Sequence, residues 1–162
     1  MQCKFIIQIL IGSIFSALTL NVSAFDNQET KEVKRKVSVE HLNAPGAAER
    51  NLPFSEAVKV GDLLFLSGQI GTMPGKLEVV KGGIQPETRQ TMENIKSVLE
   101  RHGATMDHVV KCTVFLADIN EWAKMNEVYV TYFNKHKPAR SALAASGLAL
   151  DSRVEIECIA SL

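Results

Sequence analysis

The feature that most constrains this chain is a strict alternation of side-chain type near its C-terminus. Apolar residues at every second position from Val154 to Ala160 alternate with Glu155, Glu157 and Ile159. Because successive side chains of a β-strand point to opposite faces of a sheet, this alternation predicts a strand with one apolar face and one face that carries two carboxylates. The apolar face requires a second layer of structure to cover it.

Two amphipathic helices are predicted to form that layer. The first spans residues 86–102, with apolar residues at helical spacing and Gly103 as a stop signal. The second follows Asp118 or Asn120, since either side chain can cap a helix. Its large side chains fall on one stripe and are expected in the core: Trp122, Met125, Tyr129 and Tyr132.

The rest of the chain contains shorter predicted elements. β-Branched and apolar runs predict strands over residues 37–39, 57–60, 63–67 and 109–116, whereas residues 71–83 contain turn signals and predict a loop or loosely paired hairpin. Pro138 ends any continuation of the second helix. Strands interrupted by two one-sided helices predict a two-layer α/β domain that self-associates through its uncovered sheet face.

The first 24 residues have the pattern of a secretory signal peptide. Lys4 is the only charge, residues 6–20 are mostly apolar, and Val22-Ser23-Ala24 places small residues at the cleavage positions. The apolar run is short for a membrane span, so an uncleaved anchor is the less favoured alternative. We therefore expect a signal peptide over residues 1–24, a flexible polar tail over residues 25–36 and a folded domain over residues 37–162. The mature protein is expected in the periplasm or outside the cell, free of the membrane.

Composition narrows the function classes. Of 18 basic and 18 acidic residues, cleavage removes only Lys4, which leaves a net charge of −1. That balance argues against nucleic-acid binding, which needs a strongly basic field. With four scattered histidines and no Cys-x-x-Cys pair, no metal site is expected. Cys112 and Cys158 lie in predicted strands and are interpreted as buried small hydrophobes, although an exported protein leaves a disulfide between them open.

Arg140 lies directly after a proline turn, in the string Pro138-Ala139-Arg140-Ser141. A fixed guanidinium can bind a substrate carboxylate through two hydrogen bonds, and a glutamate of the following strand can move protons. Together they predict a site for a small anionic molecule. A structural ion pair is the alternative interpretation.

Four strings in order resemble the RidA (YjgF) family of reactive-intermediate deaminases. They are residues 66–70, residues 110–116 leading into Asn120, residues 138–141 and residues 154–160, within a match that runs from about Leu52 to Ala160. The resemblance implies an α+β, two-layer chorismate-mutase-like fold, with a mixed β-sheet covered on one face by two helices. It also implies a homotrimer without a cofactor, with active sites in clefts between subunits.

The resemblance assigns chemical roles to two residues. Arg140 corresponds to the arginine that binds the carboxylate of a 2-imino acid. Glu155 corresponds to the glutamate that orders or activates the water attacking the C=N carbon, and a pKa raised by burial would let it accept and return a proton. Spacing alone does not choose between Glu155 and Glu157, which share a strand face.

Five further residues match substrate-binding positions of the family. Asn126 borders the pocket, with a plain surface residue as the alternative; Ser67 and Gly68 bring main chain near the substrate, with a strand-end turn as the alternative. Phe54 stands where many members have a tyrosine, which removes a hydroxyl and shifts the expected preference toward apolar side chains. Ala142 stands where the best-studied subgroup has a cysteine, so no thiol nucleophile is expected, but its carbonyl can orient the water.

These residues predict an exported, trimeric 2-iminobutanoate/2-iminopropanoate-type deaminase that releases 2-oxo acids and ammonia. Two alternatives stay open. One is a non-catalytic trimer that binds small carboxylates or acts as a chaperone. The other is the ribonuclease activity attributed to some relatives, which the charge balance disfavours.

Overall fold

The computed structural model describes residues 36–46 and 51–162. The predicted signal peptide, and all but the last residue of the predicted tail, lie outside the described residues. Within them, no helix combines the length and apolarity needed to cross a membrane.

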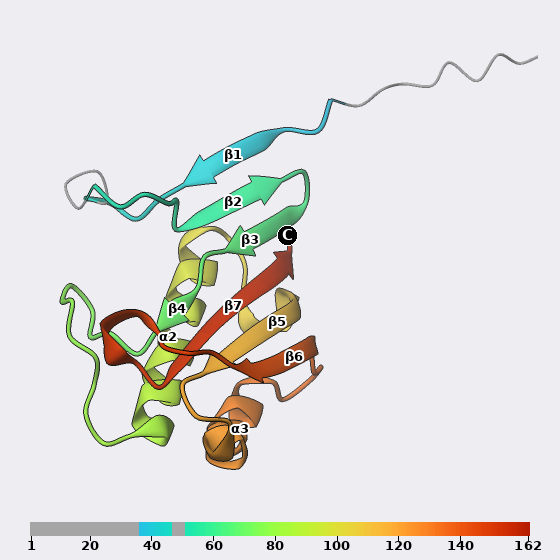
Figure 1. Cartoon of the computed structure of the whole chain (residues 1–162). Coiled ribbons are helices and arrows are strands. Elements are labelled where there is room, and N and C mark those ends of the chain that lie inside the picture. The colour runs from blue at the N-terminus through green and yellow to red at the C-terminus, as the bar shows by residue number, and fades with distance from the viewer. Residues whose placement is uncertain (1–35, 47–50) are drawn as a thin grey trace, which may run out of the picture. The chain divides into compact units, whose positions relative to one another are not determined.

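A single mixed β-sheet forms one layer of the domain (Figure 1). Its strands run in the order β1-β2-β3-β7-β5-β6, and β4 pairs with β7 beyond β3. All pairs are antiparallel except β5 with β6. The strands are β1 (Val39–Leu42), β2 (Ala57–Val60), β3 (Leu63–Leu66), β4 (Gln69–Ile70), β5 (Val109–Leu116), β6 (Ala139–Ala144) and β7 (Val154–Ser161).

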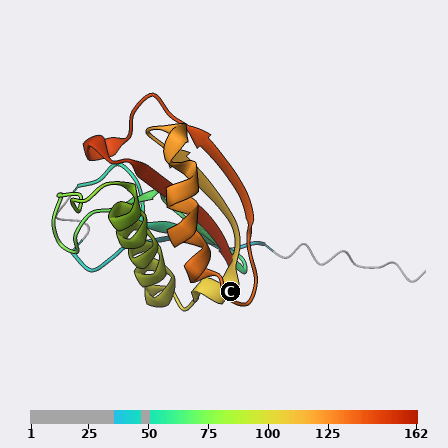
Figure 2. The same cartoon turned by 90° about the horizontal axis from the view of Figure 1, so that it is seen from below.

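Two helices form the second layer and cover one face of the sheet (Figure 2). They are α2 (Ile84–Arg101) and α3 (Trp122–Tyr129), which pack against each other. Short 3₁₀ turns occupy Met106–His108, Ile119–Glu121 and Val130–Tyr132, and an irregular turn occupies Ala149–Asp151. The predicted α+β fold, a mixed sheet with two helices on one face, is confirmed.

The predicted alternation of the C-terminal strand is also confirmed. In β7, Val154, Ile156, Cys158 and Ala160 are buried beneath the helices, whereas Glu157 is exposed on the other face. The same separation continues across the sheet, because Leu64, Cys112 and Val114 point to the helical side. Burial of such side chains contributes about 1.5–3 kcal/mol each for the larger ones, so this face holds the two layers together.

Three expectations need correction. The first strand spans 39–42 rather than 37–39, since Val39 to Leu42 are the residues that pair with β2. Strand β6 was not predicted, because its Ala- and Ser-rich sequence has low strand propensity and its pairing with β5 supplies the order. Trp122 is 41% exposed rather than part of the core, although Met125 and Tyr129 of the same stripe are buried.

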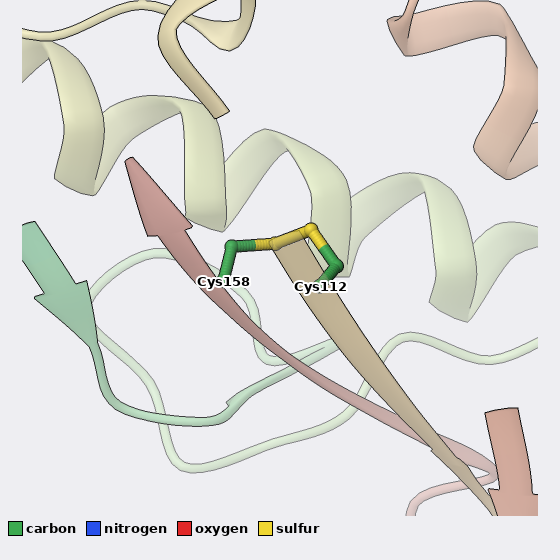
Figure 3. The surroundings of a disulfide bond; sticks show 2 residues. All are labelled: Cys112 and Cys158. Carbon is green, nitrogen blue, oxygen red and sulfur yellow. A yellow bond between two sulfur atoms is a disulfide. The ribbon is translucent and has the colours of Figure 1, made fainter. Parts of the chain in front are cut away.

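Cys112 and Cys158 are buried, as expected, and they are also bonded to each other (Figure 3). They are directly opposite partners in the antiparallel pair of β5 and β7, with Cα atoms 4.1 Å apart. Such a close pair is the non-hydrogen-bonded kind, in which side chains approach most nearly. The bridge spans 46 residues that include β6 and the start of β7.

We predict that replacing both cysteines by alanine lowers the free energy of unfolding by about 2–4 kcal/mol, because the bridge no longer restricts the unfolded chain. Guanidinium unfolding of the parent and the double variant measures the difference, and peptide mapping without reductant should find Cys112 linked to Cys158. Equal stabilities, together with unlinked peptides, would contradict the bridge.

Candidate active site

A pocket of about 870 Å³ surrounds the pairing of β4 with β7. It combines apolar side chains with a few polar groups, as ligand pockets generally do. The lining residues are Asn43, Ala44, Gly46, Asn51, Leu52, Phe54, Glu56, Gly68, Gln69, Ile70, Thr72, Leu77, Ala149, Leu150 and Glu155. Three of the residues predicted from sequence, Phe54, Gly68 and Glu155, therefore share one cavity.

Two acids line this pocket: Glu56, which forms ion pairs with Arg101 and His102, and Glu155. Glu155 lies on the face of β7 away from the helices, opposite Ile70 of β4 and Phe115 of β5, and is half-buried. Burial raises the pKa of its carboxyl above the ordinary value, and the neighbouring charge of Glu157 raises that pKa further. A carboxyl group with a raised pKa can both accept and return a proton near neutral pH. Glu157 is the exposed acid and does not line the pocket.

Gly68 makes the room that the Glu155 carboxylate occupies. A Cβ atom at position 68 would overlap Oε1 of Glu155 and lie 2.9 Å from its Cδ. This glycine is therefore needed for close approach of a side chain rather than for an unusual backbone angle. The close approach of Glu155 is a reason for glycine that the sequence did not indicate, and the predicted approach of the Gly68 main chain to a substrate stays a prediction.

Ser67 has a different position from its neighbour. Its hydroxyl donates to the main-chain oxygen of Ser55 at 2.7 Å, and its main-chain N–H donates to Glu56 at 3.0 Å. These bonds join the segment before β2 to the end of β3. The side chain of Ser67 does not line the pocket, and its role in substrate binding stays a prediction.

Arg140 belongs to a second group of side chains, which we call the arginine cluster: Arg140, Asn126, Trp122 and Tyr129. The guanidinium donates from Nη1 to Oδ1 of Asn126 at 2.7 Å. Its central carbon lies 4.7 Å from the ring centroid of Tyr129 and 5.5 Å from that of Trp122. Hydrogen bonding and cation–π attraction hold the charge in one place.

Tyr129 makes the inner wall of the arginine cluster. Its hydroxyl is buried and has no hydrogen-bond partner among the described residues. Burial raises the pKa of this phenol to about 12, so it is neutral at physiological pH and presents its ring to the cation. Trp122, on the solvent side, leaves the guanidinium partly exposed.

Within the chain, Arg140 and Glu155 lie on different faces of the sheet and do not meet. Arg140 pairs with Cys112 across β6 and β5, on the helical side of the sheet, and contacts α3. Glu155 lies on the opposite face and lines the pocket around β4. Ala142 is two residues beyond Arg140 on the same edge strand and packs toward the core. The predicted site residues thus form two separate halves.

The comparisons with known proteins agree with this fold and these motifs. A family model described as Endoribonuclease L-PSP matches residues 41–162. The chain belongs to the RidA (YjgF) family. Human 2-iminobutanoate/2-iminopropanoate deaminase is 40% identical over 128 residues, which cover 79% of this chain and 90% of the human protein. A RutC family protein of Pyrococcus horikoshii is 51% identical over 108 residues, covering 67% of this chain and 86% of that protein.

Solved structures of RidA relatives are also similar. A Rid family protein of unknown function from Yersinia pestis superimposes with a TM-score of 0.71 at 35% identity, covering 77% of this chain and all of that one. A yeast member gives a TM-score of 0.66 at 44% identity, over 77% and 95% of the two chains. The resemblance stated from the four sequence strings is confirmed at the level of family and fold.

Sequence reasoning missed the residues that hold the loop before β7. Leu150 and Asp151 have left-handed backbone angles, with φ of 56° and 53°. For residues other than glycine this conformation costs about 1–2 kcal/mol each. Buried Glu87 of α2 accepts the main-chain N–H of Arg153 at 2.7 Å, and the Arg153 guanidinium forms a two-pronged ion pair with Glu121. The sequence gives no signal for this anchor. Glu87 lies in the first turn of α2, where a glutamate is common because it interacts favourably with the helix dipole, so its burial could not be foreseen.

The described residues contain no group of three or more His, Cys, Asp or Glu side chains arranged to hold a metal ion.

The family resemblance implies imine hydrolysis with Glu155 as the acid–base group. On that expectation, Gly68→Ala is predicted to reduce the rate roughly tenfold to a hundredfold, since the new methyl group displaces the Glu155 carboxylate by about an ångström or more. Gly147→Ala is the matched control, because a Cβ at position 147 meets nothing within 4 Å and its backbone angle is ordinary. Ammonia release from a freshly generated imine gives the rates, with circular dichroism as the check on folding. If a folded Gly68→Ala protein keeps the parental rate, the predicted acid–base role of Glu155 is wrong.

Proposed function

We propose that the protein hydrolyses reactive 2-imino acids, and the enamines in equilibrium with them, to 2-oxo acids and ammonia. The observation that carries the proposal is the half-buried Glu155 carboxyl, whose pKa is raised and which projects into a pocket beside Gly68. Human and mouse relatives named 2-iminobutanoate/2-iminopropanoate deaminase, 40% and 43% identical, support the same reaction class.

In the proposed reaction, Glu155 accepts a proton from a water molecule as the water oxygen attacks the carbon of the C=N bond. Glu155 passes this proton to the imine nitrogen, which gives a tetrahedral carbinolamine with a hydroxyl and an amino group. Glu155 then takes the proton of that hydroxyl and returns it to the amino nitrogen, so the carbon–nitrogen bond breaks, ammonia leaves and the C=O bond of the 2-oxo acid forms. One water is consumed for each ammonia released, and no redox step occurs. General acid–base assistance of this kind contributes about 10²- to 10⁴-fold.

Arg140 is proposed to bind the substrate carboxylate. Within the described part of the chain its guanidinium makes one hydrogen bond, to Asn126, which leaves other N–H groups for a ligand. The aromatic rings of Trp122 and Tyr129 fix the plane of the fork. A planar guanidinium held in this way matches the geometry of a carboxylate better than an ammonium does.

Because the two halves lie on opposite faces of one sheet, the proposed site is assembled from two protomers of a homotrimer. The arginine cluster of one protomer, at its edge strand β6, would face the Glu155 pocket of the next. The sheet face without helices supports self-association, since Leu63, Phe65 and Leu143 are exposed there. Apolar side chains on an open sheet face favour contact with another chain.

Export from the cytoplasm is part of the same proposal. The N-terminal 24 residues supply the signal, and the Cys112–Cys158 disulfide supports an oxidising compartment, where such bonds persist. Mass spectrometry of the protein recovered outside the cytoplasm tests the expected N-terminus at Phe25.

Arg140→Lys and Glu155→Gln are predicted to separate binding from chemistry. Lysine keeps the charge but loses the planar fork, so imine hydrolysis should fall about tenfold to a hundredfold, the equivalent of one charged hydrogen bond of about 1.5–3 kcal/mol. Glutamine keeps the shape of Glu155 but cannot accept a proton, so turnover falls while binding of a 2-oxo acid stays close to parental. Ammonia release and calorimetric titration with 2-oxobutanoate measure the two effects.

Parental imine hydrolysis by both variants would exclude the proposed mechanism. A parent protein that binds 2-oxobutanoate through Arg140 but never accelerates ammonia release would instead support the non-catalytic carboxylate-binding trimer.

A further inference from the structure

Three large apolar side chains, which we call the apolar wall, line the pocket that contains Glu155. Phe54, Leu77 and Leu150 all line it, and each exposes half or more of its side chain. Scattered exposed leucines are ordinary on a protein surface, but here they converge on one cavity. Large side chains that remain exposed around a cavity offer contact area to an apolar part of a ligand.

Leu150 stands out within this wall because its backbone is strained. Its φ of 56° is unfavourable for leucine, whereas a glycine would adopt the same angle without cost. Bonds on the far side of the loop maintain the strain: Ser152 N–H donates to Ala149, and Arg153 N–H donates to the buried carboxylate of Glu87. Strain that surrounding structure enforces at a cavity is a sign of function.

The volume of the pocket is compatible with a larger substrate. One chain leaves about 870 Å³ beside Glu155, and in the proposed trimer this space is shared by the substrate and the neighbouring arginine cluster. Its polar lining side chains include Glu155, Gln69 and Thr72, while Phe54, Leu77 and Leu150 add a large apolar surface to the same cavity. An aliphatic substituent on the imine carbon would remove this apolar surface from water.

We propose that the pocket selects 2-imino acids with a long or branched aliphatic side chain, and that Leu150 is a specificity-determining residue of this chain. The inference rests on the proposed imine hydrolysis and adds the substrate class. Leu150 contacts the substrate side chain, whereas Glu155 acts on the C=N carbon. The strained loop is thus a means of placing an apolar side chain on the pocket wall.

The test compares imines generated in situ by an L-amino-acid oxidase from L-alanine and L-leucine. The parent is expected to show a kcat/KM at least about tenfold higher for the leucine-derived imine, since each buried methylene discriminates by roughly that factor or more. In Leu150→Gly, the two kcat/KM values should differ by no more than about threefold. The change should come mainly from a higher KM for the leucine-derived imine.

Asp151→Gly is the matched control. Asp151 shares the left-handed backbone, with φ of 53°, but does not line the pocket. Both glycine variants relieve strain, so their Tm should match each other and equal or exceed that of the parent by up to about 4 °C. Only Leu150→Gly should lose the preference. A Tm that falls in Leu150→Gly alone, with the preference retained, would make Leu150 a structural residue and overturn the inference.

Two further readouts distinguish this inference from the proposed function. If the parent hydrolyses alanine- and leucine-derived imines equally, the substrate class is wrong and the deaminase activity stands. If no imine is hydrolysed, titration with pyruvate and with 4-methyl-2-oxopentanoate still tests the apolar wall as a binding surface. Tighter binding of the larger acid, lost in Leu150→Gly, supports the specificity, and equal affinities overturn it.

Light scattering tests whether a second copy of the chain covers the apolar wall instead. Dissociation of the oligomer by Leu150→Gly would show such a contact and would also overturn the inference.

Discussion

The central strand β7 is the constraint on which the rest of the structure depends. It pairs with β3, β4 and β5 at once, so its register fixes the positions of three neighbours. A shift of one residue would turn every side chain to the other face, exposing Ile156 and Cys158 and burying two carboxylates. The buried apolar row and the Cys112–Cys158 bridge both oppose such a shift. Glu155 owes its position beside Gly68 to this register.

The sequence predicted the parts of the fold that depend on local pattern. Alternation identified β7 and helical spacing identified α2, because both signals arise from burial on one face. It could not predict β6, whose small side chains carry no pattern and whose order comes from pairing with β5. The family resemblance supplied Arg140 and Glu155, yet only the structure shows that they occupy opposite faces of the sheet. Tertiary contacts, such as Glu87 with Arg153, leave no local trace in sequence.

Two features of this chain go beyond what its family membership alone implies. The disulfide joins β5 to β7, the strand that carries Glu155, and it supports the proposed location outside the cytoplasm, where such bonds persist. The apolar wall with its strained Leu150 suggests a substrate larger than the smallest imino acids.

The central claim is that Arg140 of one protomer and Glu155 of another act on the same substrate. The most direct measurement mixes Arg140→Ala and Glu155→Gln chains in equal amounts under conditions that form mixed trimers, and records ammonia release from a freshly generated imine. Each variant alone has no complete site, but random three-fold assembly restores both native residues in roughly a quarter of the interfaces. The account predicts recovery of about that fraction of the parental rate. A mixture of confirmed mixed trimers that is no more active than either variant alone would contradict a site shared between protomers.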